Sequence, residues 1–356
     1  MVRPVLACAV AATLVAVAAQ AVSARAAGDL RPPATLQETG LYLAGQPGVV
    51  DPANRPFTPQ YPLWTDGAAK SRWIHLPAGA VIDATDVDDW EYPVGTRFWK
   101  EFAFAGRKVE TRMLWKAAPG RWVAASYVWD DAQATATLAP AGGVPWAAEV
   151  APGKWHAVPA VADCEACHGG GRMRPLGFNA LQLSTDRDPG AIHGAPASAA
   201  GVTLATLAAE RLLAPAHPEL VLSPPRIRAR DPLTRSVLGY LSTNCGSCHD
   251  GGHDITADIP SLRAADVMRD GDAVARGLLA HRTRWQLPGQ PEGASVAVYP
   301  GDPASSALLA RMRSRRPSSQ MPPMGTVLRD GEALAAVERW IAELPRLLDR
   351  ATLPRN

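Results

Sequence analysis

Hydrophobic and polar positions follow a strand-like pattern in the first half of the chain. Four runs are rich in aromatic and branched residues with partial alternation: 71–76, 96–104, 108–115 and 121–129. Gly106 and the pair Pro119-Gly120 separate the last three runs, which indicates an antiparallel meander. We therefore predict a compact β-rich domain over residues 30–150, built as a sandwich or a small barrel.

The second half of the chain follows the helical period instead. Apolar residues recur at helical spacing in five segments: 204–213, 236–241, 273–279, 305–312 and 331–344. Two similar cysteine-containing segments, each followed by a glycine-rich loop, indicate two fused units over residues 156–235 and 236–350. The predicted fold class is α+β multidomain, with the β-rich domain followed by two mainly α-helical modules.

The first 26 residues have the pattern of a secretory signal peptide. Arg3 gives a positive start, residues 4–22 are almost wholly apolar, and residues 24–26 offer a small-residue cleavage site. An uncleaved membrane anchor is the alternative, because the apolar run is close to a bilayer-spanning length. The alanine-rich run and the cleavage site favour removal of the leader, and hence an exported, periplasmic protein with no later membrane span.

Charge and composition narrow the choice of partners. The net charge of +2 falls to about zero when Arg3 and Arg25 leave with the leader, so no nucleic-acid partner is expected. Nine of the eleven Trp residues lie between Trp64 and Trp155. We interpret them as the core of the β-rich domain; the alternative is a Trp-lined surface that binds carbohydrate or docks a protein partner.

Four of the five cysteines lie in two Cys-x-x-Cys-His segments: Cys164, Cys167 and His168, then Cys245, Cys248 and His249. This spacing is the attachment signature of c-type haem, in which two thiols bond the haem vinyl groups and the histidine is the proximal iron ligand. We predict two covalently bound c-type haems on these residues. The fifth cysteine, Cys8, lies in the leader, so no cysteine remains for a structural disulfide.

Two other chemistries use paired cysteines. A thioredoxin-like site also has Cys-x-x-Cys, but it has no need of a histidine directly after the motif. A four-cysteine zinc site would have to bring together two pairs with 77 residues between them, and both histidines would be coincidental. Haem attachment accounts for all of these residues.

The sequence indicates a distal ligand more clearly for the second iron than for the first. The segment 320–325 places Met321 and Met324 among prolines and before a glycine, and we predict that Met321 binds the second iron, with Met324 as the alternative. No such loop lies between His168 and Cys245, and His193 is our candidate for the first iron. Other residues remain open for that role: Met173, His217, His75, Met113, His253, Met268 and His281. A first iron without a protein ligand would be open to a small molecule.

Several segments together resemble known haem proteins. The Met321-Pro322-Pro323 loop after a Cys-x-x-Cys-His motif, with Trp340 in a terminal helix, is similar to a class I cytochrome c domain. Residues 61–70, 176–183, 244–249 and 299–303 resemble a family of exported bacterial dihaem cytochromes with an N-terminal β-rich domain. The resemblance implies two cytochrome c-like modules and assigns no pathway.

These observations lead to two hypotheses of different classes. The first is a periplasmic electron carrier, or the cytochrome subunit of a dehydrogenase system, with protein redox partners as donor and acceptor. The second is a dihaem enzyme of peroxidase or oxidase type that uses an open first iron. The basic segment 311–316 is either a docking rim for an acidic partner or a solvated helix end. Arg226, Arg228 and Arg230 could pair with haem propionates.

Overall fold

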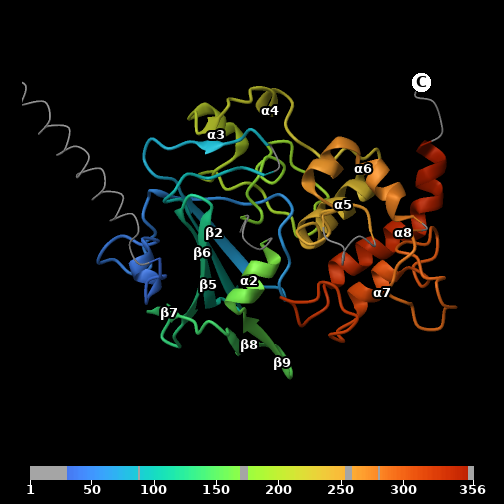
Figure 1. Cartoon of the computed structure of the whole chain (residues 1–356), viewed down its shortest axis with the longest axis horizontal. Helices are drawn as coiled ribbons and strands as arrows, with labels where there is room; N and C mark the ends of the chain where they lie inside the picture. Colours follow the sequence, from blue (N-terminus) through green and yellow to red (C-terminus); the bar gives the residue numbers. More distant parts are fainter. Residues whose placement is uncertain (1–29, 87–88, 169–174, 253–258, 280, 352–356) are drawn as a thin grey trace, which may run out of the picture.

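The computed structural model describes residues 30–86, 89–168, 175–252, 259–279 and 281–351. Figure 1 shows an antiparallel sheet on one side of the molecule and a group of C-terminal helices on the other. The predicted leader, residues 1–26, lies outside the described residues. Within the described ranges, every helix is too short or too polar to cross a membrane.

Six strands form the main sheet in the order β1-β2-β4-β5-β6-β7, and every neighbouring pair is antiparallel. The strands are β1 (Asn54–Pro56), β2 (Ala69–His75), β4 (Arg97–Phe104), β5 (Arg107–Ala118), β6 (Arg121–Trp129) and β7 (Ala136–Leu138). The predicted meander is therefore confirmed as β4, β5 and β6. Its two turns contain Gly106 at φ 80° and Gly120 at φ 66°, a left-handed conformation that favours glycine.

The two faces of the sheet are buried against different partners, because alternate residues of a strand point to opposite sides. On one face, Phe98 packs with Phe178, which comes from the loop region beyond the first Cys-x-x-Cys-His segment. On the other face, Trp99 and Met113 pack with Leu36 of the short helix η1 (Leu36–Thr39). The sheet is thus a central layer with apolar cover on both sides.

The sandwich or barrel predicted for residues 30–150 is not what forms. The sheet is open, with β1 and β7 at its edges, and the remaining strands in the described residues make only two-stranded pairs. These pairs are β3 (Ile82–Asp83) with β10 (Leu213–Ala214), and the hairpin of β8 (Val144–Ala151) with β9 (Lys154–Val158). Residues 176–213 supply part of the cover that a second sheet would give, which strand periodicity does not reveal. The coarser prediction, an α+β fold with an antiparallel sheet, is confirmed.

The predicted Trp core is confirmed only in part. Trp90, Trp99 and Trp129 are buried. Trp146 and Trp155 lie on the β8–β9 hairpin and are 73 % and 40 % exposed. The β8–β9 hairpin that carries this exposed pair extends away from the main sheet (Figure 1).

Helices follow from residue 161 onward. They are α2 (Val161–Cys167), α3 (Leu204–Ala209), α4 (Glu219–Leu222), α5 (Pro232–Cys245), α6 (Ala264–Leu278), α7 (Ala307–Arg313) and α8 (Gly331–Ala351). Four of the five predicted helical segments overlap α5, α6, α7 and α8. The predicted helix over 204–213 is shorter than expected, because Arg211 adopts φ 57° and the chain turns into β10.

Helix α5 joins the sheet side of the molecule to the helical side. It begins with Pro232 after Asp231, whose side chain accepts the Thr234 backbone N–H at 2.8 Å. Its Gly239 lies against the ring of Tyr61, so closely that a Cβ atom would lie 2.1 Å from Tyr61 Cε1. Buried apolar residues of α5, α6 and α8 complete the helical core.

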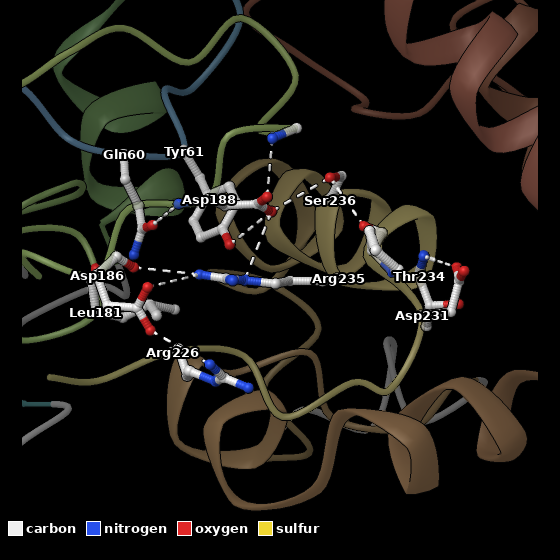
Figure 2. A network of polar contacts seen from close by, with 12 residues as sticks. Gln60, Tyr61, Leu181, Asp186, Asp188, Arg226, Asp231, Thr234, Arg235 and Ser236 are labelled. Carbon is white, nitrogen blue, oxygen red and sulfur yellow. Dashed lines mark hydrogen bonds and ion pairs between the residues drawn. The ribbon is translucent and has the colours of Figure 1, made fainter. Parts of the chain in front are cut away.

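A polar network reinforces this junction (Figure 2). Tyr61 Oη donates to Asp188 Oδ2 at 3.0 Å, and Ser236 Oγ of α5 donates to the same oxygen at 3.2 Å. Arg235 Nε lies 3.8 Å from Asp188 Oδ2, and its Nη2 lies 3.9 Å from Asp186 Oδ1. Three distant segments of the chain are therefore fixed to one another at the N-terminal half of α5, the helix that ends in the second Cys-x-x-Cys-His segment.

Candidate functional site

The first Cys-x-x-Cys-His segment is carried by a short helix directly after the β8–β9 hairpin. Asp163 Oδ2 accepts the Ala160 N–H at 3.0 Å and caps the start of α2. Cys164 and Cys167 lie on this helix, and the His168 N–H donates to the Cys164 carbonyl at 2.9 Å. The helix therefore places two thiols and one imidazole within a single turn.

The second segment forms the C-terminal end of α5. Cys245 is the last residue of the helix, and the His249 N–H donates to its carbonyl at 2.8 Å. Gly246 is required here, because a Cβ atom would lie 2.4 Å from the Ser242 carbonyl oxygen and 2.6 Å from that of Leu262. Asn244 Oδ1 accepts the Trp64 N–H at 2.9 Å, so the segment before β2 contacts the residue that directly precedes this motif.

Both segments open into one cavity of about 910 Å³. Its wall includes all six motif residues: Cys164, Cys167, His168, Cys245, Cys248 and His249. Burial raises the pKa of the Cys167 thiol, and the nearby Cys248 raises it further. The two motifs that were expected to open separate modules thus face a common space.

The four thiols have the chemistry that haem attachment needs. None of them is in a disulfide, so each is available to form a thioether. They do not form a metal cage, since no group of three or more His, Cys, Asp or Glu side chains within the described chain is arranged to hold a metal ion. The cavity is lined mainly by apolar side chains, with histidine and methionine donors, and this donor set fits two haem groups.

The loop that contains Met321 and Met324 also lines the cavity. The Met321 N–H donates to the Arg311 carbonyl at 3.0 Å, which ties the loop to the end of α7. Gly325 turns the chain at φ 80° before α8, as the sequence predicts. Because both methionines reach the wall, the choice of Met321 over Met324 as iron ligand stays a prediction.

Asp66 fixes the chain just beyond this methionine loop. It is 5 % exposed, and its Oδ1 accepts the N–H groups of Val327 and Leu328 at 2.8 and 2.9 Å. A residue just before β2 therefore holds a segment that lies about 260 positions later in the chain. The sequence gives no signal for this contact.

His156 is a wall residue that the sequence analysis missed. It is 2 % exposed; its Nε2 lies 2.8 Å from Glu110 Oε1 and its Nδ1 3.5 Å from Asp66 Oδ2. Burial lowers the pKa of the imidazole, but the hydrogen bonds to Asp66 and Glu110 outweigh it, so the pKa is raised overall. Glu110 in turn pairs with Arg112, whose Nε donates to Glu110 Oε2 at 2.9 Å.

His193, the predicted distal ligand of the first iron, is not among the residues that line the cavity. Its Nε2 lies 2.9 Å from both carboxylate oxygens of Asp330, and its Nδ1 lies 3.1 Å from Glu332 Oε2. The hydrogen bond and the charge of Asp330 raise the pKa of His193. The His193 imidazole contacts two carboxylates at the start of α8. This position gives no support to His193 as a ligand of the first iron.

The other candidates for that role are placed as follows. His217 bonds Glu219 Oε1 at 2.7 Å and the Ala84 carbonyl at 2.9 Å. Met113 touches the wall, but its side chain packs with Trp99 in the apolar cluster on the opposite face of the sheet. His75, Met268 and His281 are not lining residues, and Met173 and His253 lie outside the described residues.

Most arginines of the basic segment 311–316 and of the set Arg226, Arg228 and Arg230 either pair with carboxylates or line the cavity. Arg313 pairs with Glu338 at 2.6 Å, while Arg311 and Arg315 line the cavity. Arg226 lies 3.6 Å from Asp186 and Arg230 lies 3.8 Å from Asp272. Neither Arg226 nor Arg230 contributes to the cavity wall, so propionate pairing by them gains no support.

Comparison of the chain with protein-family models, curated proteins and solved structures gives no match. The function therefore has to be argued from the cavity and its motifs.

Proposed function

We propose that the protein is a periplasmic dihaem c-type cytochrome that passes electrons between a protein donor and a protein acceptor. Cys164 and Cys167 would hold one haem with His168 as proximal ligand. Cys245 and Cys248 would hold the other, and His249 and Met321 would be the residues that bind its iron. Bound haem supplies a one-electron couple, and the chain attaches, ligates and shields it.

One observation carries this proposal: both attachment motifs line the same cavity. Two haems held there would be neighbours, so an electron that enters at one could reach the other without leaving the protein. The wall combines residues of the sheet, α2, α5 and the methionine loop, which supports the two cytochrome c-like modules acting as one unit. Wall residues from the main sheet also support a part for the β-rich region in the haem site.

Electron exchange between the haems can be tested directly. We would reduce the oxidised holoprotein with less than one photogenerated electron per molecule and follow both haem absorption bands. The expected result is redistribution between the haems at a rate that does not depend on protein concentration. A redistribution rate proportional to protein concentration would contradict exchange inside the cavity.

A second function is favoured by the charged groups on the sheet side of the cavity. His156 and Glu110 are buried acid–base groups, and Glu110, paired with Arg112, lies close enough to Cys164 to influence the pKa of that thiol. No wall methionine in the described residues belongs to residues 156–235. Such groups could move protons during reduction of a small oxidant at an open first iron. Electron paramagnetic resonance with added cyanide separates the two functions: a high-spin iron that binds cyanide supports the enzyme, and two unresponsive low-spin irons support the carrier.

A further inference from the structure

Three cations lie side by side on the cavity face of the sheet, and we call them the cationic row. They are Arg72 of β2, Lys100 of β4 and Arg112 of β5. The strand register places Arg72 opposite Lys100, and Lys100 opposite Arg112. All three line the cavity. Like charges directly opposite one another destabilise a sheet, and a negative group nearby would offset the repulsion among these three cations.

The chain itself supplies only part of that charge. Arg112 is paired with Glu110, at 2.9 Å. Within the described part of the chain, the Arg72 guanidinium and the Lys100 ammonium have no hydrogen bond or ion pair, although Arg72 is only 8 % exposed. Lys100 Nζ lies 5.0 Å from the centre of the Phe102 ring, a contact that does not neutralise it. A buried charge without a partner is costly, which indicates that Arg72, with the partly buried Lys100 beside it, faces an anion in the functional protein.

The electrostatics of the row agree with this arrangement. Burial lowers the pKa of Lys100 well below its usual range, and the neighbouring Arg72, Lys70 and Arg112 lower it further. Burial also lowers the pKa of Arg72 to about 10. A negative group in the cavity would oppose both shifts, because an opposite charge nearby favours the charged form.

The position of the row relative to the first motif indicates which anion fits. Helix α2, which carries the first two thiols, contacts β6, the neighbour of β5 in the sheet (Figure 1). Neighbouring strands are about 4.8 Å apart, so Lys100 and Arg72 lie about 5 and 10 Å beyond Arg112 in the direction away from β6. In a haem, the vinyl groups that bond the thiols and the two propionates lie on opposite edges of the ring. A haem attached at α2 can therefore direct its carboxylates toward the unpartnered cations.

We propose that the cationic row binds the propionate carboxylates of the haem attached through Cys164 and Cys167. Lys100 and Arg72 make the contacts, and Arg112, held by Glu110, completes the positive wall. The inference rests on the proposed function, because it needs a haem at the first motif. A free organic acid has the same carboxylate chemistry and is the other source of such a group.

Neutral variants of the row test the proposal. Lys100→Gln and Arg72→Gln holoproteins are compared with Arg97→Gln, which removes a cation from the same strand β4 on the opposite face, beside Trp115. Loss of a cation leaves propionate charge that favours the oxidised iron. Potentiometric titration should therefore show one of the two midpoint potentials falling in both row variants and neither changing in Arg97→Gln. Unchanged potentials in row variants that carry two haems would overturn the inference.

Calorimetric titration with succinate distinguishes the two carboxylate sources. We expect no succinate binding to the wild-type holoprotein, because the propionates occupy the row. One-to-one succinate binding that Lys100→Gln abolishes would overturn the inference and assign the row to a free acid. Failure of the proposed function is a separate result, since it would appear as a wild-type haem count other than two.

Discussion

His156 is held between two carboxylates, and its charge should influence stability in a defined pH window. Its pKa lies above the ordinary value of 6.5 in the folded protein. The folded state therefore binds this proton more tightly, and the stabilisation is complete below pH 6.5 and lost as the pH rises through the folded-state pKa. The pKa of Glu110 is shifted in the opposite direction, because it is lowered in the folded protein. Glu110 therefore stabilises the fold above its ordinary pKa of 4.5, and this stabilisation is lost as the pH falls through the folded-state pKa.

We expect the free energy of unfolding to fall between about pH 6 and about pH 8 more steeply in the wild type than in His156→Gln. Guanidinium denaturation of both holoproteins at the two pH values measures this difference. Equal pH dependence in the two proteins would contradict a charged His156 in the folded state.

Met321 and Met324 offer a matched pair of substitutions, because both lie in one loop and both line the cavity. Met321→Ala should remove the spectroscopic signature of a methionine-ligated, low-spin iron from one haem and leave the other haem unchanged. Met324→Ala is the control and should retain the signature. The reverse result would move the ligand to Met324.

At the scale of elements, the contact between α5 and Tyr61 positions the second attachment motif. Ala at position 239 would press on the Tyr61 ring, and overpacking of this kind typically costs about 1–3 kcal/mol. We therefore expect Gly239→Ala to lower the free energy of unfolding by about that amount, as measured by chemical denaturation. Gly331→Ala is the control, because a Cβ atom added there, at the start of α8, would have no neighbour within 4 Å. If Gly239→Ala were as stable as the control, the close approach of α5 and Tyr61 would be wrong.

The sequence predicted those elements whose signals are local. The β4–β5–β6 meander follows from strand patterning and two glycine turns, and α8 follows from a long helical period. The cover of the sheet by residues 176–213 could not be predicted, since it depends on a contact between segments that are distant in sequence. The same limit applies to His156, whose neighbours Glu110 and Asp66 come from other parts of the chain. The cationic row could have been predicted in part from the sequence, because the correct register between the predicted strands aligns Lys100 with Arg112.

At the scale of the whole molecule, Asp66 connects the segment before β2 to the chain just beyond the methionine loop through two backbone N–H groups. Asp66→Ala leaves those N–H groups and the Nδ1 of His156 without their acceptor, a loss that costs about 1–3 kcal/mol for a buried group. We expect reduced stability and a partial loss of the methionine-ligated iron signal, measured by denaturation and by electron paramagnetic resonance. Full retention of that signal would show that the loop is positioned without the Asp66 contact.

The shared cavity makes covalent attachment of two haems the claim on which the rest depends. The most direct measurement is the intact mass of the denatured protein, produced in cells that attach c-type haem. Denaturation removes every group that is not covalently bound. We predict the mass of the polypeptide plus two haems, and plus one haem when Cys164 and Cys167 are both replaced by Ala. A mass equal to the polypeptide alone would contradict the account.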